Sequence, residues 1–338
     1  MFGLLGSTNR AVKEVRAGPF GPRFLFGPRV RYAVGRIFGR LKGEGDSMAC
    51  TAISGHTHLV SLFGRPVQHS LSPALHTASF ARLGIDAVYL CLETDAEGLP
   101  AAVDAMRRLD GWDGGNVTMP CKQAIIPLLD ALSEGARLMG AVNVIEKHEG
   151  RLIGHNTDGA GFTANLRKHG VEVQGVRIVL LGPGGAGSAV LVQAALEGAA
   201  SIEVFAREGG PSYTRATTLL PEVAAATGCE LRLHAFEDAR AMRRAITEAD
   251  LLVNATSVGM GAGCTQSPVP AEFLQDVRTV ADVIYFPQVT QLMVDAQAAG
   301  CQVVGGLGMM AEQAALGERI WYGVDARMDD FLSEILGA

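Results

Sequence analysis

The sequence predicts an α/β protein of two domains, in which strands alternate with helices. Its 338 residues correspond to two domains at roughly 150 residues each. From residue 58 onward, short apolar runs of strand length alternate with stretches of helical periodicity. A glycine-rich turn joins one of these runs to a helix in the second half. This alternation is typical of parallel strands with helices packed on both faces of the sheet.

The amino-acid composition narrows the classes of function open to this chain. Hydrophobic residues make up 48% and charged residues 19%, which excludes global disorder. The net charge of −6 argues against nucleic acid as the main partner, because phosphate neutralisation needs clustered positive charge. The six cysteines form no CxxC pair, so we expect no metal site and a reducing, cytoplasmic location. Residues 178–196 have membrane-spanning length, but Pro183 and the adjacent glycines favour a strand, a turn and a helix, so no membrane association is expected.

The first residues differ from the rest of the chain in charge. Nine Lys and Arg against three acids give residues 1–47 a net charge of +6, so the remainder carries −12. We expect residues 1–54 to be a basic, disordered extension, or the product of an upstream start codon with Met48 as the working start. A basic targeting or surface-binding arm is the alternative, although the stretch lacks the apolar core of a secretory signal.

Apolar runs and helix-start residues predict the elements of the first half. Strands are expected at residues 58–64 and 87–93, within the run GGNVTM, and in a hairpin that turns at Glu149-Gly150. Helices are expected from Ser72-Pro73, around residues 97–109 and from Asp158.

The second half continues the same alternation. Expected strands lie at residues 177–182, 201–207, 230–236, 251–256, 279–285 and 302–306. Expected helices lie at residues 186–196, 212–226, 238–248, 289–299 and 308–322. Strands that alternate with helices in this way predict a parallel sheet covered on both faces.

The turn after residue 181 carries a dinucleotide-binding signature. Gly182, Gly184 and Gly187 have the G-x-G-x-x-G spacing between a strand and a helix. The first glycine permits the tight turn, the second lets the backbone approach a pyrophosphate, and the third permits close packing of helix on strand. The helix N-terminus, which includes Gly185 and Ala186, favours the negative charge of the pyrophosphate. A glycine-rich turn without a ligand is the alternative.

Two charged residues at the end of the next strand bear on the choice of cofactor. Glu208 lies 21 positions after Gly187, near the offset of about 20 residues for the acid that binds the ribose 2′-hydroxyl of NAD. Arg207 would instead stack on adenine or meet the 2′-phosphate of NADP. Because an acid at that place would repel a phosphate, the sequence favours NAD over NADP. A solvated Arg-Glu pair on a turn is the alternative.

Polar residues at strand ends and helix starts indicate a second site. Ser70 and Ser72 offer hydroxyls beside helix-start N–H groups, an arrangement that suits a carboxylate or simple helix capping. Lys122 stands where a helix would start, near the positive end of its dipole, and is either a proton-transfer group or a solvated surface lysine. Asp158, at a helix start after Asn156 and Thr157, is either a helix cap or a functional carboxylate. Asn143 is an amide inside an apolar strand and needs a hydrogen-bonding partner.

These motifs together resemble the shikimate dehydrogenase family, including its quinate/shikimate branch. The resemblance covers about residues 58–325 and rests on eight motifs in order: GRPVQHSLSPALH, GGNVTMPCK, GAVNV, GHNTDGAG, LGPGGAG, VNATSVGM, DVIYFP and GGLGMMAEQA. It implies an NAD(P)-dependent oxidoreductase that interconverts shikimate and 3-dehydroshikimate, and in the quinate branch quinate and 3-dehydroquinate, by hydride transfer.

The resemblance also implies which residues bind substrate and cofactor. Residues 55–157, completed by 308–338, would form an α/β substrate-binding catalytic domain with a mixed sheet, and residues 158–307 a Rossmann-like NAD(P)-binding domain. Lys122 and Asp158 would be the catalytic acid/base pair. The substrate-binding residues would be Ser70, Ser72, Thr118, Asn143, Tyr285 and Gln313. The cofactor-binding residues would be Gly182, Gly184, Gly185, Ala186, Gly187, Arg207, Glu208, Thr256, Gly306 and Met309.

Departures from the family pattern keep some alternatives open. The family often has threonine after the asparagine that matches Asn143, whereas this chain has Val144. Valine also occurs there in some quinate/shikimate members. Ala206 stands before Arg207 in place of the asparagine of the family's NADP pattern, which favours NAD. The alternatives are a related two-domain dehydrogenase for aminoshikimate or methylene-tetrahydrofolate, and a catalytically silent ligand-sensing protein. We expect a small-molecule substrate and a monomer or homodimer.

Overall fold

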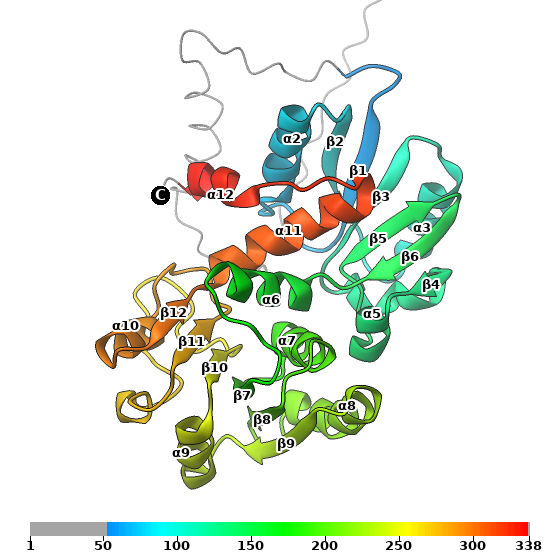
Figure 1. Cartoon of the computed structure of the whole chain (residues 1–338). Helices are drawn as coiled ribbons and strands as arrows, with labels where there is room; N and C mark the ends of the chain where they lie inside the picture. The colour runs from blue at the N-terminus through cyan, green and yellow to red at the C-terminus, as the bar shows by residue number, and fades with distance from the viewer. Residues whose placement is uncertain (1–52, 337–338) are drawn as a thin grey trace, which may run out of the picture.

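The computed structural model describes residues 53–336, which form two six-stranded sheets connected by helices (Figure 1). The predicted basic extension therefore lies outside the described residues, except for its last two positions. The α/β class with a mixed first sheet and a parallel second sheet is as the sequence predicts.

The first sheet is mixed and has helices on both faces. Its strand order is β2-β1-β3-β5-β6-β4, with β1 parallel to β2 and β3, and β5 antiparallel to β3 and β6. The strands are β1 (His58–Gly64), β2 (Ala87–Glu93), β3 (Trp112–Val117), β4 (Ala131–Leu132), β5 (Val144–His148) and β6 (Arg151–His155). Successive side chains of a strand point to opposite faces. Accordingly, Leu62 packs with Phe80 of α2 (Ser72–Leu83), and Phe63 packs with Leu99 of α3 (Leu99–Arg108).

The second sheet is entirely parallel, with the order β12-β11-β10-β7-β8-β9. Its strands are β7 (Arg177–Leu181), β8 (Ser201–Ala206), β9 (Glu230–Ala235), β10 (Leu251–Asn254), β11 (Thr279–Asp282) and β12 (Gln302–Val304). The helices α7 (Gly185–Leu196) and α8 (Pro211–Thr227) cover one face, and α9 (Ala239–Glu248) and α10 (Gln291–Ala298) cover the other. The chain leaves β7 toward β8 and later crosses back to β10, so the strand order reverses at β7. In sheets of this kind, ligands bind beyond the carboxyl ends of the strands at such a reversal.

Two helices cross the region between the sheets and pack against each other (Figure 1). They are α6 (Asp158–Lys168) and α11 (Gly306–Tyr322). A Cβ on Gly161 of α6 would lie 2.7 Å from the backbone N of Gln313 in α11, so only glycine permits this approach. The last helix, α12 (Met328–Leu336), returns to α2, where Phe331 and Leu332 pack with Leu75. The C-terminal helices are thus anchored on the first sheet's side of the molecule.

Most predicted elements match the structure to within a few residues. The hairpin turns at Glu149 and Gly150, which have φ values of 49° and 78°, as a tight hairpin turn requires. Strands β10, β11 and β12 are shorter than expected. Short elements escaped the sequence pattern because they contain too few residues to display a period. They are β4, α5 (Glu134–Met139), and the 3-10 turns η1 (Ile126–Leu128) and η2 (Ala271–Phe273); the longer α12 was also not anticipated. The helix expected to start near Lys122 is the single turn α4 (Cys121–Ala124).

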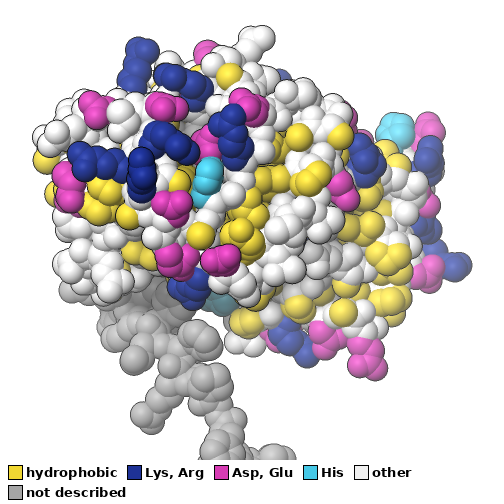
Figure 2. All heavy atoms as spheres, turned by 90° about the horizontal axis from the view of Figure 1, so that it is seen from below, with side chains coloured by type: hydrophobic (Ala, Val, Ile, Leu, Met, Phe, Trp, Pro, Cys, Tyr) yellow, Lys and Arg dark blue, Asp and Glu magenta, His cyan; other side chains and the backbone are white. Residues whose placement is uncertain are grey.

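The surface carries charges of both signs. In the view from below, acidic and basic side chains are interspersed, with hydrophobic side chains between them (Figure 2). Selectivity for an anionic small molecule must therefore come from local donors instead of a one-signed field over this face. Within residues 53–336, no helix combines the length and apolar character needed to cross a bilayer.

Candidate active site

Lys122 and Asp158 form an ion pair beside the first sheet. Lys122 Nζ lies 2.6 Å from Asp158 Oδ2, and the two side chains are 27% and 12% exposed. Lys122 belongs to α4, just after β3, and Asp158 is the first residue of α6. Asp158 does not cap its helix, since the cap position is Thr157, and Lys122 is not a solvated surface lysine. The interpretations of Asp158 as a helix cap and of Lys122 as a solvated surface lysine are therefore both wrong.

Asn143 hydrogen-bonds with Asp158 of the pair and with the neighbouring Thr157. Its Nδ2 donates to Asp158 Oδ1 at 2.8 Å and to Thr157 Oγ1 at 3.0 Å. Its Oδ1 accepts from the backbone N of Thr157 at 2.8 Å. The predicted need of this buried amide for partners is thus met, and both oxygens of the Asp158 carboxylate are occupied. The carboxylate is therefore fixed in orientation toward Lys122.

Gln313 reaches the same cluster from α11, far along the chain. Its Oε1 accepts from Asn143 Nδ2 at 3.4 Å, and its backbone O accepts from Thr157 Oγ1 at 3.2 Å. The close approach of α6 and α11 at Gly161 brings the residue there. Four predicted substrate or acid/base residues consequently meet at one place: Lys122, Asp158, Asn143 and Gln313.

Two residues that the sequence reasoning missed extend this cluster. Tyr89 OH donates to Asn116 Oδ1 at 2.7 Å, and Asn116 Nδ2 donates to the backbone O of Asn143 at 3.0 Å. Burial raises the pKa of Tyr89 well above its usual value, while a hydrogen bond with Ser72 acts in the opposite direction, so the phenol stays protonated as a donor. Asn116 had a sequence signal, because it is an amide within an apolar strand. Tyr89 had none.

The two serines lie where β1 leads into α2. Ser70 Oγ accepts from the backbone N of Ser72 at 3.2 Å, so Ser70 satisfies one helix-start N–H. Ser72 is the first residue of α2 and not its cap, and its hydroxyl lies near that of Tyr89, whose pKa it acts to lower. A continuous set of contacts therefore runs from Ser72 through Tyr89 and Asn116 to Asn143.

The remaining two predicted substrate residues differ in placement. Thr118 lies at the end of β3, with its backbone N donating to Phe63 O at 2.8 Å and its methyl group packed against Gly64. Tyr285 follows β11 and is 51% exposed. Among the described contacts, none joins Tyr285 to the Lys122–Asp158 pair.

The glycine-rich turn between β7 and α7 fits a dinucleotide pyrophosphate. Gly182 has φ 84°, and a Cβ there would lie 2.7 Å from Thr256 Cγ2. A Cβ on Gly187 would lie 2.0 Å from the backbone O of Gly182. By contrast, nothing lies within 4 Å of a Cβ on Gly184 or Gly185. Protein atoms therefore fill the space beside Gly182 and Gly187, where the turn packs on its neighbours. The space beside Gly184 and Gly185 is free for a phosphate, at the N-terminus of a 12-residue helix.

The loops after β10 and β11 hold the other predicted cofactor residues. Asn254 Oδ1 accepts from the backbone N and Oγ1 of Thr256 at 3.0 and 2.7 Å, which fixes the Thr256 hydroxyl. A Cβ on Gly306 would lie 2.3 Å from Val283 O, so the start of α11 packs tightly on the end of β11. Met309 is 8% exposed and packs in the core, and Ala186 packs at the edge of the same cluster.

Arg207 and Glu208 follow β8 and are both exposed. Arg215, in the second turn of α8, is a third charged residue at this place. Its Nη2 donates to the backbone O of Pro183 at 3.3 Å, within the glycine-rich turn. Two guanidinium groups and one carboxylate therefore lie near the edge of this cradle.

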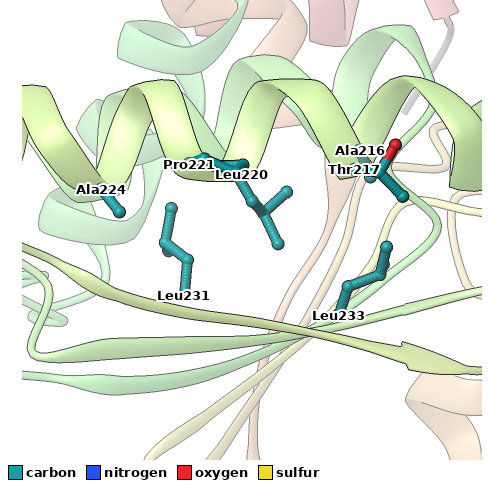
Figure 3. Close-up of a pocket in the computed structure, with 7 residues that line it drawn as sticks. All are labelled: Ala216, Thr217, Leu220, Pro221, Ala224, Leu231 and Leu233. Atoms are coloured by element: carbon teal, nitrogen blue, oxygen red, sulfur yellow. The ribbon is translucent and has the colours of Figure 1, made fainter.

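A separate hollow lies away from these residues, between α8 and the edge strand β9. It has a volume of about 280 Å³ and is lined by Ala216, Thr217, Leu220, Pro221, Ala224, Leu231 and Leu233 (Figure 3). The lining is alkyl apart from one hydroxyl, so it offers no acid/base or charged group. In the part of the chain that the structure describes, no cluster of three or more His, Cys, Asp or Glu side chains is placed to hold a metal ion.

Comparisons with known proteins agree with this arrangement. Residues 62–145 match the family model described as the shikimate dehydrogenase substrate binding domain. Shikimate dehydrogenase (NADP(+)) of Streptococcus suis strain 05ZYH33 is 41% identical over 278 residues, covering 82% of this chain and 95% of the relative.

Solved structures extend the likeness to the whole fold. Shikimate 5-dehydrogenase from Listeria monocytogenes, in complex with shikimate and NAD, is 38% identical with a TM-score of 0.81, covering 84% of this chain and 98% of that one. Quinate dehydrogenase from Corynebacterium glutamicum, in complex with NAD, is 31% identical with a TM-score of 0.73, covering 83% and 99%. Identity above two fifths to a curated relative, over most of both chains, confirms the resemblance in the sequence motifs: the chain belongs to the shikimate dehydrogenase family.

Proposed function

We propose that this protein is an NAD(P)-dependent oxidoreductase that interconverts shikimate and 3-dehydroshikimate, with Lys122 and Asp158 as its acid/base pair. The observation that carries the proposal is the 2.6 Å contact between Lys122 Nζ and Asp158 Oδ2, in a cluster that also contains Asn143 and Gln313. The activity in the names of relatives that match over most of the chain supports the choice of substrate.

The substrate would lie across the contacts that run from Ser72 to Lys122. Ser70 and Ser72 would bind its carboxylate at the start of α2, where backbone N–H groups also favour an anion. Thr118, Asn143 and Gln313 would hold the ring hydroxyls, and Tyr285 would approach the carboxylate from the second sheet's side. In this proposal residues 55–157 with 308–338 bind the substrate, and residues 158–307 bind the dinucleotide.

The pair would move the hydroxyl proton. When bound, the nicotinamide supplies the hydride acceptor or donor. Oxidation of the secondary alcohol also releases the proton of its hydroxyl, and reduction requires that proton on the carbonyl oxygen. Because Asp158 has one oxygen on Asn143 and the other on Lys122, its carboxylate orients the lysine, whose Nζ would face the substrate. Lys122 would exchange the proton with the substrate oxygen, and Asp158 would stabilise the ammonium form.

The cradle would accept NADP in preference to NAD. Sequence reasoning favoured NAD because of Glu208, and the comparisons do not confirm that preference. Relatives named for NADP(+) support the opposite choice, as does Arg215, which would offer a guanidinium beside Arg207 for a 2′-phosphate. Both neighbouring structures described above contain NAD, so both cofactors enter the test.

Steady-state kinetics test this proposal directly. Purified protein should reduce NADP+ with shikimate, and Lys122→Ala should lose turnover by about a hundredfold or more while it still binds shikimate. Lys147→Ala is the matched control, because Lys147 is a lysine of the same sheet region that donates to the backbone O of Leu109. Near-normal turnover in the Lys122 variant would mean that the acid/base assignment is wrong.

Quinate oxidation is the second candidate. The likeness to quinate dehydrogenase, together with Val144 after Asn143, favours it. Quinate differs from shikimate by a tertiary hydroxyl and a saturated ring. Kinetics with both substrates, each against NAD+ and NADP+, decide between them.

A further inference from the structure

Glu318 is a buried carboxylate that the reaction described above does not use. It lies in α11, and its side chain is 0% exposed. Oε1 is 2.8 Å from His76 Nδ1, and Oε2 accepts from Ser79 Oγ at 2.7 Å. Both partners belong to α2. A carboxylate out of water is costly unless its oxygens are satisfied, and here each oxygen has one partner from the same neighbouring helix.

The two helices joined by Glu318 carry opposite ends of the proposed substrate site. Ser72 lies one helical turn before His76 in α2, on the same face. Gln313 lies five residues before Glu318 in α11, about 7.5 Å along the helix axis. The distance between Ser72 and Gln313 is therefore set by how α11 lies on α2.

His76 links this contact to the middle of the site. Its ring stacks on Tyr89, with centroids 4.6 Å apart and an interplanar angle of 18°, and Trp321 meets it edge-on at 5.4 Å. The Tyr89 hydroxyl donates to Asn116 Oδ1 at 2.7 Å and lies near Ser72. Glu318 thus fixes, by a hydrogen bond, the His76 ring on which the Tyr89 ring stacks.

Other contacts hold the end of α11 on the first sheet but do not reach α2 through polar groups. Trp321 Nε1 donates to Ile145 O at 3.0 Å, and Tyr322 OH donates to Asp113 Oδ2 at 2.9 Å. These contacts fix the helix on β5 and β3. Among the described side chains of α11, Glu318 is the one whose carboxylate bonds directly to α2.

We propose that Glu318 is a positioning residue for substrate binding: through His76 and Ser79 it fixes α11 on α2, so that Ser72 and Gln313 can hold one substrate molecule at the same time. This inference rests on the proposed function, because it takes Ser72 and Gln313 as substrate contacts. It adds a residue that touches neither substrate nor cofactor and acts only through the distance between the two helices.

Kinetics of Glu318 variants test the proposal. Glu318→Ala removes both contacts and should raise the shikimate KM about tenfold, with kcat and the cofactor KM changed less than about twofold. Glu318→Gln keeps the shape and can keep both contacts, since the Ser79 hydroxyl can accept as well as donate, so it should restore the KM to near the wild-type value. Val223→Ala is the control for lost stability, because it creates a cavity at a fully buried side chain of α8. It should leave the shikimate KM unchanged.

A double-variant comparison separates positioning from general loosening. In a Gln313→Ala background, Glu318→Ala should raise the shikimate KM further by less than about twofold, because the contact that it aligns is already gone. If Glu318→Ala fails to fold, Ser79→Ala carries the test, with an expected rise of about threefold in the shikimate KM and an unchanged kcat.

The possible failures can be told apart. A wild-type protein without shikimate turnover overturns the proposed function and this inference with it. The inference alone is overturned if the wild type turns over shikimate and Glu318→Ala leaves the shikimate KM unchanged. The same holds for Ser79→Ala where that variant carries the test. A rise in KM of the same size in Val223→Ala, or full additivity with Gln313→Ala, also overturns the inference.

Discussion

Asn143 Nδ2 lies 2.8 Å from Asp158 Oδ1, while Lys122 Nζ lies 2.6 Å from the other oxygen of the same carboxylate. The amide and the ammonium group thus hold one carboxylate from two sides. A carboxylate held in this way keeps its orientation when substrate enters, which is the preorganisation that proton transfer needs.

Asp158→Asn should lower kcat for shikimate oxidation by about a hundredfold. The neutral amide cannot stabilise the ammonium form of Lys122. Its N–H group would also face either Lys122 Nζ or Asn143 Nδ2, and both of these are donors. Turnover is compared with that of Glu146→Gln, which alters a carboxylate that pairs with His155 in the nearby hairpin. A kcat for Asp158→Asn within about threefold of the wild type would contradict the assignment.

The glycines of the turn after β7 should separate into two classes when replaced by alanine. Gly187→Ala should lower the free energy of unfolding by about 1–3 kcal/mol, because its Cβ would overlap the backbone O of Gly182. Gly185→Ala should leave that free energy equal or slightly higher, since its Cβ meets no atom within 4 Å in a helical position. It should nevertheless raise the cofactor KM. Urea unfolding and cofactor kinetics measure the two quantities, and equal effects of both variants on stability would be inconsistent with this cradle.

Charged residues near the cradle should control the choice between NADP+ and NAD+. Glu208→Gln should raise kcat/KM for NADP+ about fivefold, because it removes a negative charge near the 2′-phosphate. Arg215→Ala should lower kcat/KM for NADP+ about tenfold and have less effect with NAD+. Arg232→Ala, which alters an exposed arginine paired with Glu203 on the edge strand, serves as the control. If Arg215→Ala changes both cofactors equally, Arg215 does not meet the phosphate.

The buried carboxyl of Asp282 should make stability depend on pH in an unusual direction. Burial raises the pKa of Asp282, against hydrogen bonds from Ile284 N, Thr290 and Asn254. The native state therefore binds the proton more tightly than the unfolded state, whose pKa is about 3.9, so this group adds stability as the pH falls through its raised pKa. Relative to Asp282→Asn, the wild type should gain free energy of unfolding between about pH 7 and pH 4.

Asp250 provides the matched control of opposite sign. Its hydrogen bond with Arg177 lowers the pKa of Asp250, so the stability that it contributes is present above the unfolded pKa and is lost as the pH falls through its lowered pKa. Relative to Asp250→Asn, the wild type should lose stability as acid is added. Urea unfolding at a series of pH values compares the two pairs, and the same direction in both would refute the account of Asp282.

Much of the fold and part of the site follow from local sequence patterns. The G-x-G-x-x-G spacing at Gly182 predicts a turn between a strand and a helix, and the structure has both. The hairpin at Glu149 and Gly150 follows from turn residues between two apolar runs. These features depend on neighbours along the chain, and so a single sequence is sufficient to predict them. The short elements β4 and α5 are missed because two to six residues carry no readable period.

The sequence by itself determined the alternation of strands and helices, the dinucleotide turn, and the residue types available for acid/base chemistry. Only the tertiary structure decided that Lys122 meets Asp158 and that Asn143 bridges them to Gln313. It also decided that Tyr89 and Asn116 adjoin this cluster and that Arg215 contacts the glycine-rich turn. The reason is physical. Backbone preferences and apolar periodicity act over a few residues, whereas these contacts arise where separate helices and strands pack. Glycines such as Gly161 set how closely those elements can approach, and nothing in the local pattern around Lys122 records that distance.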